Sequence, residues 1–373
     1  MTSPTEAAAA AWPRRLRSGA ASLAIRLGLT LPLTAGLGPS LEVARRLGRA
    51  YGASGANRAR VERAVGRIPP AVPHLDREGR RELVLRGYEH LAMLAVEIAM
   101  SPRLINRTTW HRHIDVGDIG GLLGALVRDR PTILVTGHCG NWEILGMAAG
   151  VLGVPMAAVY RPLDLAPLDA WVRRTRRERG LELVDKFSAM QRLPDVLARG
   201  GRPAFVADQN AGDRGIFVPF LGRLASSYKS IGLLAMQHRA DVIVSTANRV
   251  GPEGGASGGD GRRGGAGRFH LFLEDTITHE AYTSAPDPLF YLTARYRRAI
   301  ERAVRRHPEQ YLWMHRIWKS RPPHERRDRP FPAGLRSRLA DLPWMSGEDV
   351  DRLVDRSERD RVWLREHGVE RLP

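Results

Sequence analysis

A histidine and a glutamate five positions apart are the side chains in this sequence with the clearest capacity for chemistry. His138 and Glu143 follow the apolar run Thr132–Thr136 and are accompanied by Gly137 and Gly140. An imidazole can act as a general base toward a hydroxyl group, and the helix dipole favours a carboxylate in the first turn of a helix. The pair therefore indicates a catalytic turn. The alternative is a hydrogen-bonded turn histidine beside an ordinary first-turn charge, because such a spacing also recurs by chance.

The neighbours of His138 leave two other chemistries open. Cys139 could act as a covalent nucleophile beside the imidazole, although a free cysteine more often packs as a small hydrophobic side chain. A metal site would have to recruit Cys139, or His111 and His113 from an earlier segment. Their spacing matches no established metal-binding motif, so the sequence predicts no bound metal.

The elements around this turn determine where its side chains point. Thr132–Thr136 is rich in branched residues and predicts a buried strand, which runs into an apolar helix from Ile144 to Leu152. The same patterns predict further strands at Met156–Tyr160, Ala204–Ala207, Val242–Thr246 and Phe269–Leu273, and helices at Leu168–Arg179, Ala189–Arg199, Ile231–Arg239 and Tyr291–His307. This alternation predicts an α/β fold with a central mixed, mostly parallel sheet flanked by helices. The carboxyl ends of such strands form the usual ligand crevice, so the turn at His138 is expected to face one.

Residues 1–100 are predicted to form a helical region that associates with a membrane. Apolar residues keep helical spacing over residues 40–66 and 75–101. Before them, Trp12 and several arginines accompany an apolar stretch, which favours an amphipathic helical segment lying at a membrane surface. Arg26 and Pro32 interrupt that stretch, so it is too broken to span a bilayer. The alternative is a helical hairpin that caps the core.

The composition narrows the class of partner. The chain has 373 residues, with 58 Lys and Arg against 40 Asp and Glu, and a net charge of +18. This charge favours an anionic partner, either nucleic acid, an acidic protein or a membrane surface. A single cysteine excludes an internal disulfide and fits a reducing compartment. Residues 101–320 carry the α/β pattern, with a flexible glycine-rich loop expected at 251–267, and residues 321–373 are expected to form a charged C-terminal tail.

Four segments of the chain match, in order, the sequence blocks of one enzyme family. The first, Thr136–Glu143, contains a histidine, four residues and then an acidic residue, and the others are Val159–Pro162, Asp208–Arg223 and Pro308–Lys319. On these blocks the sequence resembles the bacterial lipid A biosynthesis acyltransferases, the lauroyl/myristoyl transferase family of the lysophospholipid acyltransferase superfamily. Four ordered blocks are more specific than one short motif. Cys139 departs from the family pattern, in which an aromatic residue is commoner.

The resemblance implies a reaction and a set of site residues. The family moves a fatty acyl chain from an acyl-carrier-protein thioester, or here a coenzyme A thioester, to a hydroxyl of a membrane glycolipid of the lipid A precursor type, and it needs no cofactor. By this resemblance His138 would be the general base, and Glu143 would orient it or assist its proton relay. Asp208 would offer His138 a second carboxylate, unless it is a structural turn residue. Asn141 and the backbone amides of the glycine turn would stabilise the oxyanion.

The resemblance also implies partners and a location. Arg161 and Arg214 would bind lipid phosphate or the phosphopantetheine arm of the donor, or else remain solvated surface charges. The arginine-rich helix at Trp171–Arg177 would face lipid headgroups or the acidic carrier protein. The enzyme would lie on the cytoplasmic face of the bacterial inner membrane as a peripheral or monotopic protein, with no nucleic acid as partner.

Two other functions remain open from the sequence. One lies in the same superfamily, an acyltransferase acting on a phosphatidylinositol mannoside or a lysophospholipid, because the blocks identify the chemistry better than the acceptor. The other is a basic, non-enzymatic protein that binds nucleic acid. The charge permits it, but the sequence contains no helix-turn-helix, zinc or RNA-binding signature.

Overall fold

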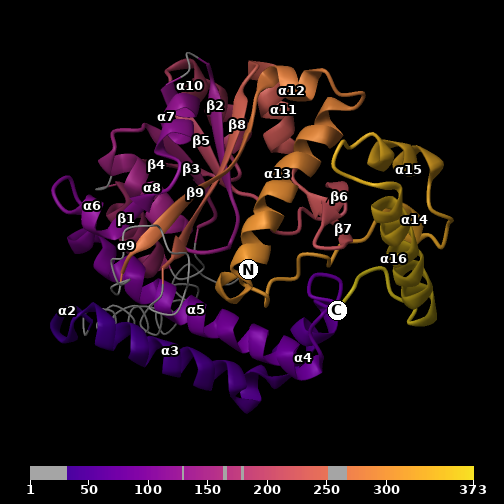
Figure 1. Ribbon diagram of the computed structural model, residues 1–373, viewed down its shortest axis with the longest axis horizontal. Helices are drawn as coiled ribbons and strands as arrows, with labels where there is room; N and C mark the ends of the chain where they lie inside the picture. The colour runs from indigo at the N-terminus through magenta and orange to yellow at the C-terminus, as the bar shows by residue number, and fades with distance from the viewer. Residues whose placement is uncertain (1–31, 128–129, 163–165, 178–179, 251–266) are drawn as a thin grey trace, which may run out of the picture.

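A seven-stranded sheet forms the centre of the computed structural model, which describes residues 32–127, 130–162, 166–177, 180–250 and 267–373 (Figure 1). The strands lie in the order β1–β9–β8–β2–β5–β3–β4. Their bounds are Ile114–Val116 (β1), Thr132–Thr136 (β2), Met156–Tyr160 (β3), Leu181–Asp185 (β4), Arg202–Val206 (β5), Asp241–Arg249 (β8) and Phe269–Ile277 (β9). Neighbouring strands are parallel except for β8 and β9, which are antiparallel. The predicted mixed, mostly parallel sheet is therefore confirmed.

Helices cover both faces of the sheet, which explains the apolar strands at its centre. One face carries α7 (Ile119–Val127), α8 (Trp142–Val151) and α9 (Ala166–Arg177), and the other carries α10 (Ala189–Ala198), α11 (Lys229–His238), α12 (His279–Thr283) and α13 (Pro288–Arg306) (Figure 1). Thr132 and Ile133, which point to opposite faces of β2, are both buried. A strand covered on both faces reads as a continuous apolar run, as this one does.

An N-terminal group of helices lies along one edge of this core, at the bottom of Figure 1. Its elements are α2 (Pro32–Ala35), α3 (Leu37–Ala53), the short 3-10 helix η1 (Gly55–Asn57), α4 (Arg58–Arg67) and α5 (Arg77–Leu104), and α6 (Trp110–His113) follows. The predicted helix over residues 40–66 is in fact two helices, because η1 separates α3 from α4. The predicted helix at 75–101 corresponds to α5, whose first turn is capped by Asp76, which accepts a hydrogen bond from the amide of Gly79 at 2.7 Å.

The segment after residue 320 folds rather than trailing from the domain. It forms α14 (Pro323–Arg326), α15 (Ala333–Ala340) and α16 (Gly347–Glu366), after the 3-10 helix η2 (Pro308–Gln310). These helices pack beside α13 and the β6–β7 hairpin (Ile216–Phe220 and Arg223–Ser227) (Figure 1). Arg321 and Glu325 are buried and pair with each other there. Part of the charge that suggested a tail thus serves buried ion pairs, and the rest forms mainly exposed pairs such as those of Arg352 with Glu348 and Asp349.

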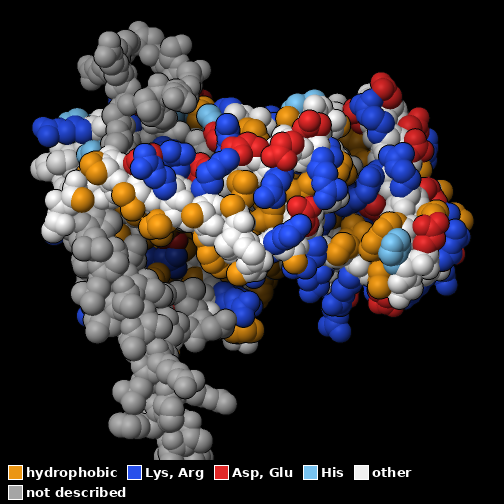
Figure 2. Space-filling model, turned by 90° about the horizontal axis from the view of Figure 1, so that it is seen from below, with side chains coloured by type: hydrophobic (Ala, Val, Ile, Leu, Met, Phe, Trp, Pro, Cys, Tyr) orange, Lys and Arg blue, Asp and Glu red, His pale blue; other side chains and the backbone are white. Residues whose placement is uncertain are grey.

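The side of the molecule on which α3 lies exposes hydrophobic side chains among Lys and Arg side chains (Figure 2). On α3, Val43, Leu47 and Tyr51 are more than half exposed and follow one another at helical spacing. In the part of the chain that the structure describes, no helix is both long and apolar enough to cross a membrane. The amphipathic segment predicted around Trp12 and most of the glycine-rich loop at 251–267 lie outside the described residues.

Candidate active site

His138 and Asp208 meet because they leave neighbouring parallel strands at the same level. β2 pairs with β5 so that Thr136 lies opposite Val206, and each functional residue follows two positions later. The amide of Ala207 continues the ladder by donating to the carbonyl oxygen of Thr136 at 2.8 Å. Both side chains therefore stand at the carboxyl edge of the sheet, where α/β folds bind their ligands.

The carboxylate of Asp208 holds the imidazole of His138 in one orientation. Oδ1 of Asp208 lies 2.6 Å from Nδ1 of His138, and Oδ2 accepts a hydrogen bond from the His138 backbone amide at 2.7 Å. Burial disfavours the charged carboxylate, but the attraction of His138 and these hydrogen bonds outweigh it, so the pKa of Asp208 lies well below its usual range. An ionised Asp208 requires the proton on Nδ1, which leaves the lone pair on Nε2. An imidazole held in this way can accept a proton at Nε2.

Glycines at two positions allow the turn to sit this close to its neighbours. A Cβ atom on Gly137 would lie 2.5 Å from Cγ2 of Ile300 on α13 and 3.2 Å from Oδ2 of Asp208. Gly140 has a φ of 67°, and a Cβ atom there would lie 2.1 Å from the carbonyl oxygen of Ala247. A larger residue at either position would displace the turn that carries His138.

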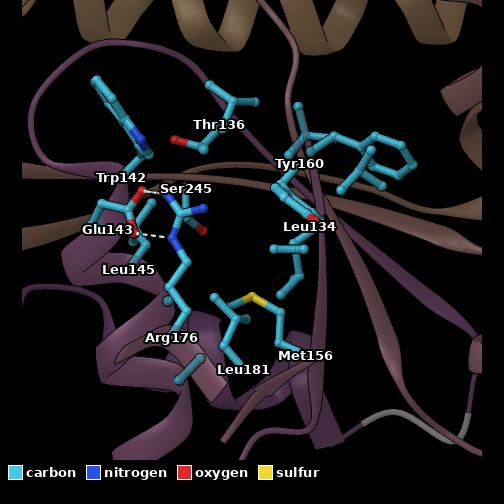
Figure 3. A pocket seen from close by; sticks show the side chains of 18 of the residues that line it. Leu134, Thr136, Trp142, Glu143, Leu145, Met156, Tyr160, Arg176, Leu181 and Ser245 are labelled. Atoms are coloured by element: carbon cyan, nitrogen blue, oxygen red, sulfur yellow. Dashed lines mark hydrogen bonds and ion pairs between the residues drawn. The ribbon is translucent and has the colours of Figure 1, made fainter. Parts of the chain in front are cut away.

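Glu143 does not contact the imidazole, contrary to the expectation that it orients His138. Its carboxylate pairs with Arg176 of α9, whose Nε donates to Oε2 at 3.0 Å while Nη2 donates to Oε1. The Glu143 side chain is 10% exposed and that of Arg176 25%. Figure 3 shows the pair meeting within a pocket, between Trp142 and Thr136 at one end and Leu181 and Met156 at the other. The place next to the ring belongs to Asp208 instead.

Asn141 is also turned away from a substrate role, which corrects its prediction as an oxyanion donor. It caps α8: Oδ1 accepts from the amides of Glu143 and Ile144, both at 3.2 Å. Its Nδ2 donates to Glu97 of α5 at 2.9 Å, and Glu97 in turn pairs with Arg249 of β8. Asn141 is buried, so its amide builds the turn and is not available to a ligand.

The environment of Cys139 argues against a covalent nucleophile. Its side chain is fully buried, and burial raises the pKa of the thiol well above its ordinary value. The thiolate, which is the reactive form of cysteine, is therefore not populated near neutral pH. Cys139 instead belongs to the main hydrophobic cluster, which also contains Tyr311 and Trp313.

A large and mainly apolar pocket opens beside His138. It has a volume of about 860 Å³ and runs along the sheet from its carboxyl edge toward the start of β3. Its wall comes from the strands β2, β3, β5 and β8 and from the helices α7, α8 and α9. The apolar residues drawn in Figure 3 include Leu134, Leu145, Met156 and Leu181. Such a cavity has the size and character of a site for an apolar ligand.

The pocket wall contains only one of the two predicted arginines, together with residues that the sequence did not single out. Arg161 is exposed and lines it, whereas Arg214 is exposed and lies outside its wall. Three lining residues were not singled out individually from the sequence. Arg176 was grouped with surface arginines, Trp142 contacts the His138 ring edge-on at 4.7 Å between centroids, and Gln209 places its amide nitrogen 3.4 Å from Nε2 of His138. Trp142 and Gln209 directly follow Asn141 and Asp208, which were predicted as site residues, so their place in the sequence could have indicated them.

Similarity to known proteins shows the family to which the chain belongs. The family model described as bacterial lipid A biosynthesis acyltransferase matches residues 39–320. The lipid A biosynthesis palmitoleoyltransferase of Escherichia coli K12 and a lipid A biosynthesis acyltransferase of Shigella flexneri are each 26% identical over 253 residues, covering 67% of this chain and 76% of the relative. The lipid A biosynthesis lauroyltransferase of E. coli K12 is 24% identical over 259 residues, with the same coverage. The chain therefore belongs to the bacterial lipid A biosynthesis acyltransferase family and is an acyltransferase.

Proposed function

We propose that this enzyme transfers a fatty acyl chain from a thioester donor to a hydroxyl group of a membrane glycolipid of the lipid A precursor type. The donor is an acyl-carrier-protein thioester, with coenzyme A as the alternative carrier. The enzyme works at the cytoplasmic face of the bacterial inner membrane as a peripheral or monotopic protein. The names of its relatives, which assign them to lipid A biosynthesis, support the glycolipid acceptor. The net charge of +18 suits a membrane surface and an acidic carrier.

The observation that carries this proposal is the position of one imidazole at the wall of one cavity. His138 is held by Asp208 at Nδ1, which leaves Nε2 as a base, and it lines an apolar pocket of about 860 Å³. Acyl transfer needs these two features together: a base for the hydroxyl group and an apolar space for the chain.

This geometry supports a reaction in two steps: the acceptor hydroxyl attacks the thioester, and the resulting tetrahedral intermediate then collapses. Nε2 of His138 takes the proton of the acceptor hydroxyl, and the oxygen attacks the thioester carbonyl carbon. The C–O bond forms, and the negative charge moves to the carbonyl oxygen, to which the amide of Gln209 can donate a hydrogen bond. When the intermediate collapses the C–S bond breaks, and the imidazolium returns its proton to the leaving thiolate. Asp208 stabilises the imidazolium between these steps.

Charged side chains near the pocket support binding of anionic substrates. Arg161 is exposed at the pocket and can bind a phosphate of either substrate. Arg214 lies outside the pocket wall, so we propose for it a contact with a distal part of a substrate. Glu143, paired with Arg176, shapes the pocket beside the base.

The test is an acyl-transfer assay read by mass spectrometry. Carrier-protein and coenzyme A thioesters are offered in turn with a lipid A precursor, a phosphatidylinositol mannoside and a lysophospholipid. We expect transfer to the lipid A precursor, and we expect His138→Ala to lose about 10²- to 10⁴-fold in turnover while it stays folded. Full activity of His138→Ala would refute the mechanism, and exclusive use of another acceptor would refute the assignment of the glycolipid.

A further inference from the structure

The mouth of the pocket can be located from its exposed lining residues. At the carboxyl edge of the sheet these are Arg161, Lys186, Met190, Gln209 and Tyr228. Arg161, Lys186 and Gln209 follow the ends of β3, β4 and β5. Met190 lies in the first turn of α10, and Tyr228 directly precedes α11. Any substrate that reaches His138 from this edge must pass them.

Exposed hydrophobic side chains gather beside this mouth. Phe187 follows β4 and is 82% exposed, and Met190, one turn further into α10, is 44% exposed. On α11, which packs against α10, Leu233 is 47% exposed and Tyr228 at the start of the helix is 38% exposed. We define the rim patch as these residues and the two lysines among them. Its members are Lys186, Phe187, Met190, Tyr228, Lys229 and Leu233.

The charge of the rim patch is positive and comes from an uncommon residue in this chain. Lys186, Lys229 and Lys319 are the only lysines in the whole sequence, against a large excess of arginine, and two of them lie in the rim patch. The ammonium of Lys186 lies 4.6 Å from the centroid of the Phe187 ring. Lys229 stands four residues before Leu233 and so shares its face of α11. Each lysine is thus next to an exposed apolar side chain.

We propose that the rim patch is the surface by which this enzyme rests on an anionic lipid bilayer, with Phe187 and Leu233 among the acyl chains and both lysines at the headgroups. The inference rests on the proposed glycolipid acceptor and adds the surface that receives it. An exposed methylene costs free energy in water, so a mouth that touches the bilayer lets the acceptor reach His138 without exposing its own chains. Lysine suits this boundary because its long apolar stem can lie in the membrane while the ammonium stays at the headgroups.

The arrangement fits a bilayer better than an acidic carrier protein. A contact with an acidic carrier that is recognised by charge does not require Phe187, which is 82% exposed at a turn. Apolar side chains flanked by cations, in contrast, are the usual composition of an interfacial membrane contact.

The proposal can be tested by fluorescent labelling, because the chain has a single native cysteine. Cys139 is fully buried, so a cysteine introduced at the surface can be labelled selectively with the fluorophore NBD. We would label the full-length Phe187→Cys variant and the control Ser284→Cys. Ser284 is exposed and follows α12, which lies at the amino end of β8, on the opposite edge of the sheet. Vesicles would contain phosphatidylcholine alone, or with about one third phosphatidylglycerol as the anionic lipid.

We expect the label at position 187, and not the label at 284, to shift to the blue on anionic vesicles and to be quenched by brominated acyl chains. We also expect Phe187→Asp/Leu233→Asp to weaken partitioning onto anionic vesicles about tenfold with its melting temperature unchanged, since both positions are exposed. A label at 187 that responds to an acyl carrier protein and stays silent on vesicles would overturn the proposal. Unchanged partitioning of the double variant would overturn it as well.

Activity separates this proposal from the proposed function. The double Asp variant leaves His138, Asp208 and the pocket wall untouched, so it should acylate acceptor dispersed in detergent at the wild-type rate and lose rate only on acceptor in vesicles. If the enzyme transfers no acyl chain to any glycolipid, the acceptor assignment fails, while the fluorescence result still decides where the protein contacts the bilayer.

Discussion

The carboxylate of Asp208 contacts His138 at two points. Its Oδ1 lies 2.6 Å from Nδ1 of the ring, and its Oδ2 accepts a hydrogen bond from the backbone amide at 2.7 Å. One carboxylate thus fixes both the ring and the turn that carries it. Asp208 is itself fully buried, two residues after the strand β5 that pairs with β2. The imidazole is oriented before any substrate arrives, which lowers the cost of reaching a reactive geometry.

We predict that Asp208→Asn lowers turnover by about 10²- to 10⁴-fold with little change in KM. The amide can still accept or donate one hydrogen bond, but it no longer requires the proton on Nδ1 and no longer stabilises an imidazolium. Steady-state kinetics with saturating thioester and circular dichroism of the variant check this. Asp208→Asn with more than half of the wild-type turnover would show that the second carboxylate is structural only.

Glu143 is predicted to matter less for turnover than Asp208, because its carboxylate contacts Arg176 and not the imidazole. Glu143→Gln leaves Arg176 unpaired in the pocket wall and should cost about 1–3 kcal/mol of stability, less than the loss of a fully buried pair since Arg176 is partly exposed. Urea unfolding of Glu143→Gln, Arg176→Gln and the double variant measures the coupling between the two residues. Additive losses in the two single variants would mean that the ion pair contributes nothing.

The fold and the position of the catalytic turn could be predicted from the sequence, because both depend on local patterns. Apolar runs marked β2, β3, β5, β8 and β9, and the glycines around His138 marked a sharp turn at a strand end. Within the seven-stranded sheet, β1 and β4 were not predicted, because each carries acidic residues that dilute the apolar pattern. The strands of the β6–β7 hairpin were not predicted either. Asp208 remained ambiguous, since only the pairing of β2 with β5 brings it to His138.

Side-chain partners were harder to predict than backbone position. Glu143 has the spacing to reach His138, but a helix fixes only the direction of its side chain, and Arg176 on another helix decides the contact. The position of Asn141 also has a structural explanation, which the prediction of an oxyanion donor does not use. An asparagine directly before an apolar helix is a common N-cap, and the structure shows Asn141 in that role. Arg176 was one arginine among several on α9, and sequence alone does not say which of them turns inward.

Gly146 on α8 is predicted to help set the length of the acyl chain. It lines the pocket, and a Cβ atom there would lie 3.5 Å from Cε of Met156 and 3.6 Å from Cδ2 of Leu181, which is ordinary contact. Gly146→Ala should therefore be tolerated, whereas the branched side chain of Gly146→Leu would fill the space between α8 and the sheet. We expect Gly146→Leu to select shorter chains from a mixture of thioesters, with the products read by mass. The same product distribution in both variants would place the chain elsewhere.

The stability of the enzyme is predicted to fall in mild acid because of His90, which lies under the catalytic turn. Its Nε2 lies 3.1 Å from the carbonyl oxygen of Gly140. Burial, aided by the charge of Arg249, lowers the pKa of His90 from 6.5 to about 3. Between these pH values the unfolded chain binds a proton that the folded chain does not, so the free energy of unfolding decreases as the pH drops. By pH 5 the loss from this one group is about 2 kcal/mol.

Replacing the imidazole tests this linkage directly. His90→Gln keeps an N–H group for the carbonyl of Gly140 but cannot bind a proton, so its stability should fall less between pH 7 and pH 5 than that of the wild type. Some dependence must persist in the variant, because burial and the neighbouring His138 lower the pKa of His315 to about 4, and His315 therefore destabilises the fold over the same range. Urea unfolding of both proteins at the two pH values gives the difference. Parallel losses would show that His90 is protonated in the folded state, which its burial against Arg249 should prevent.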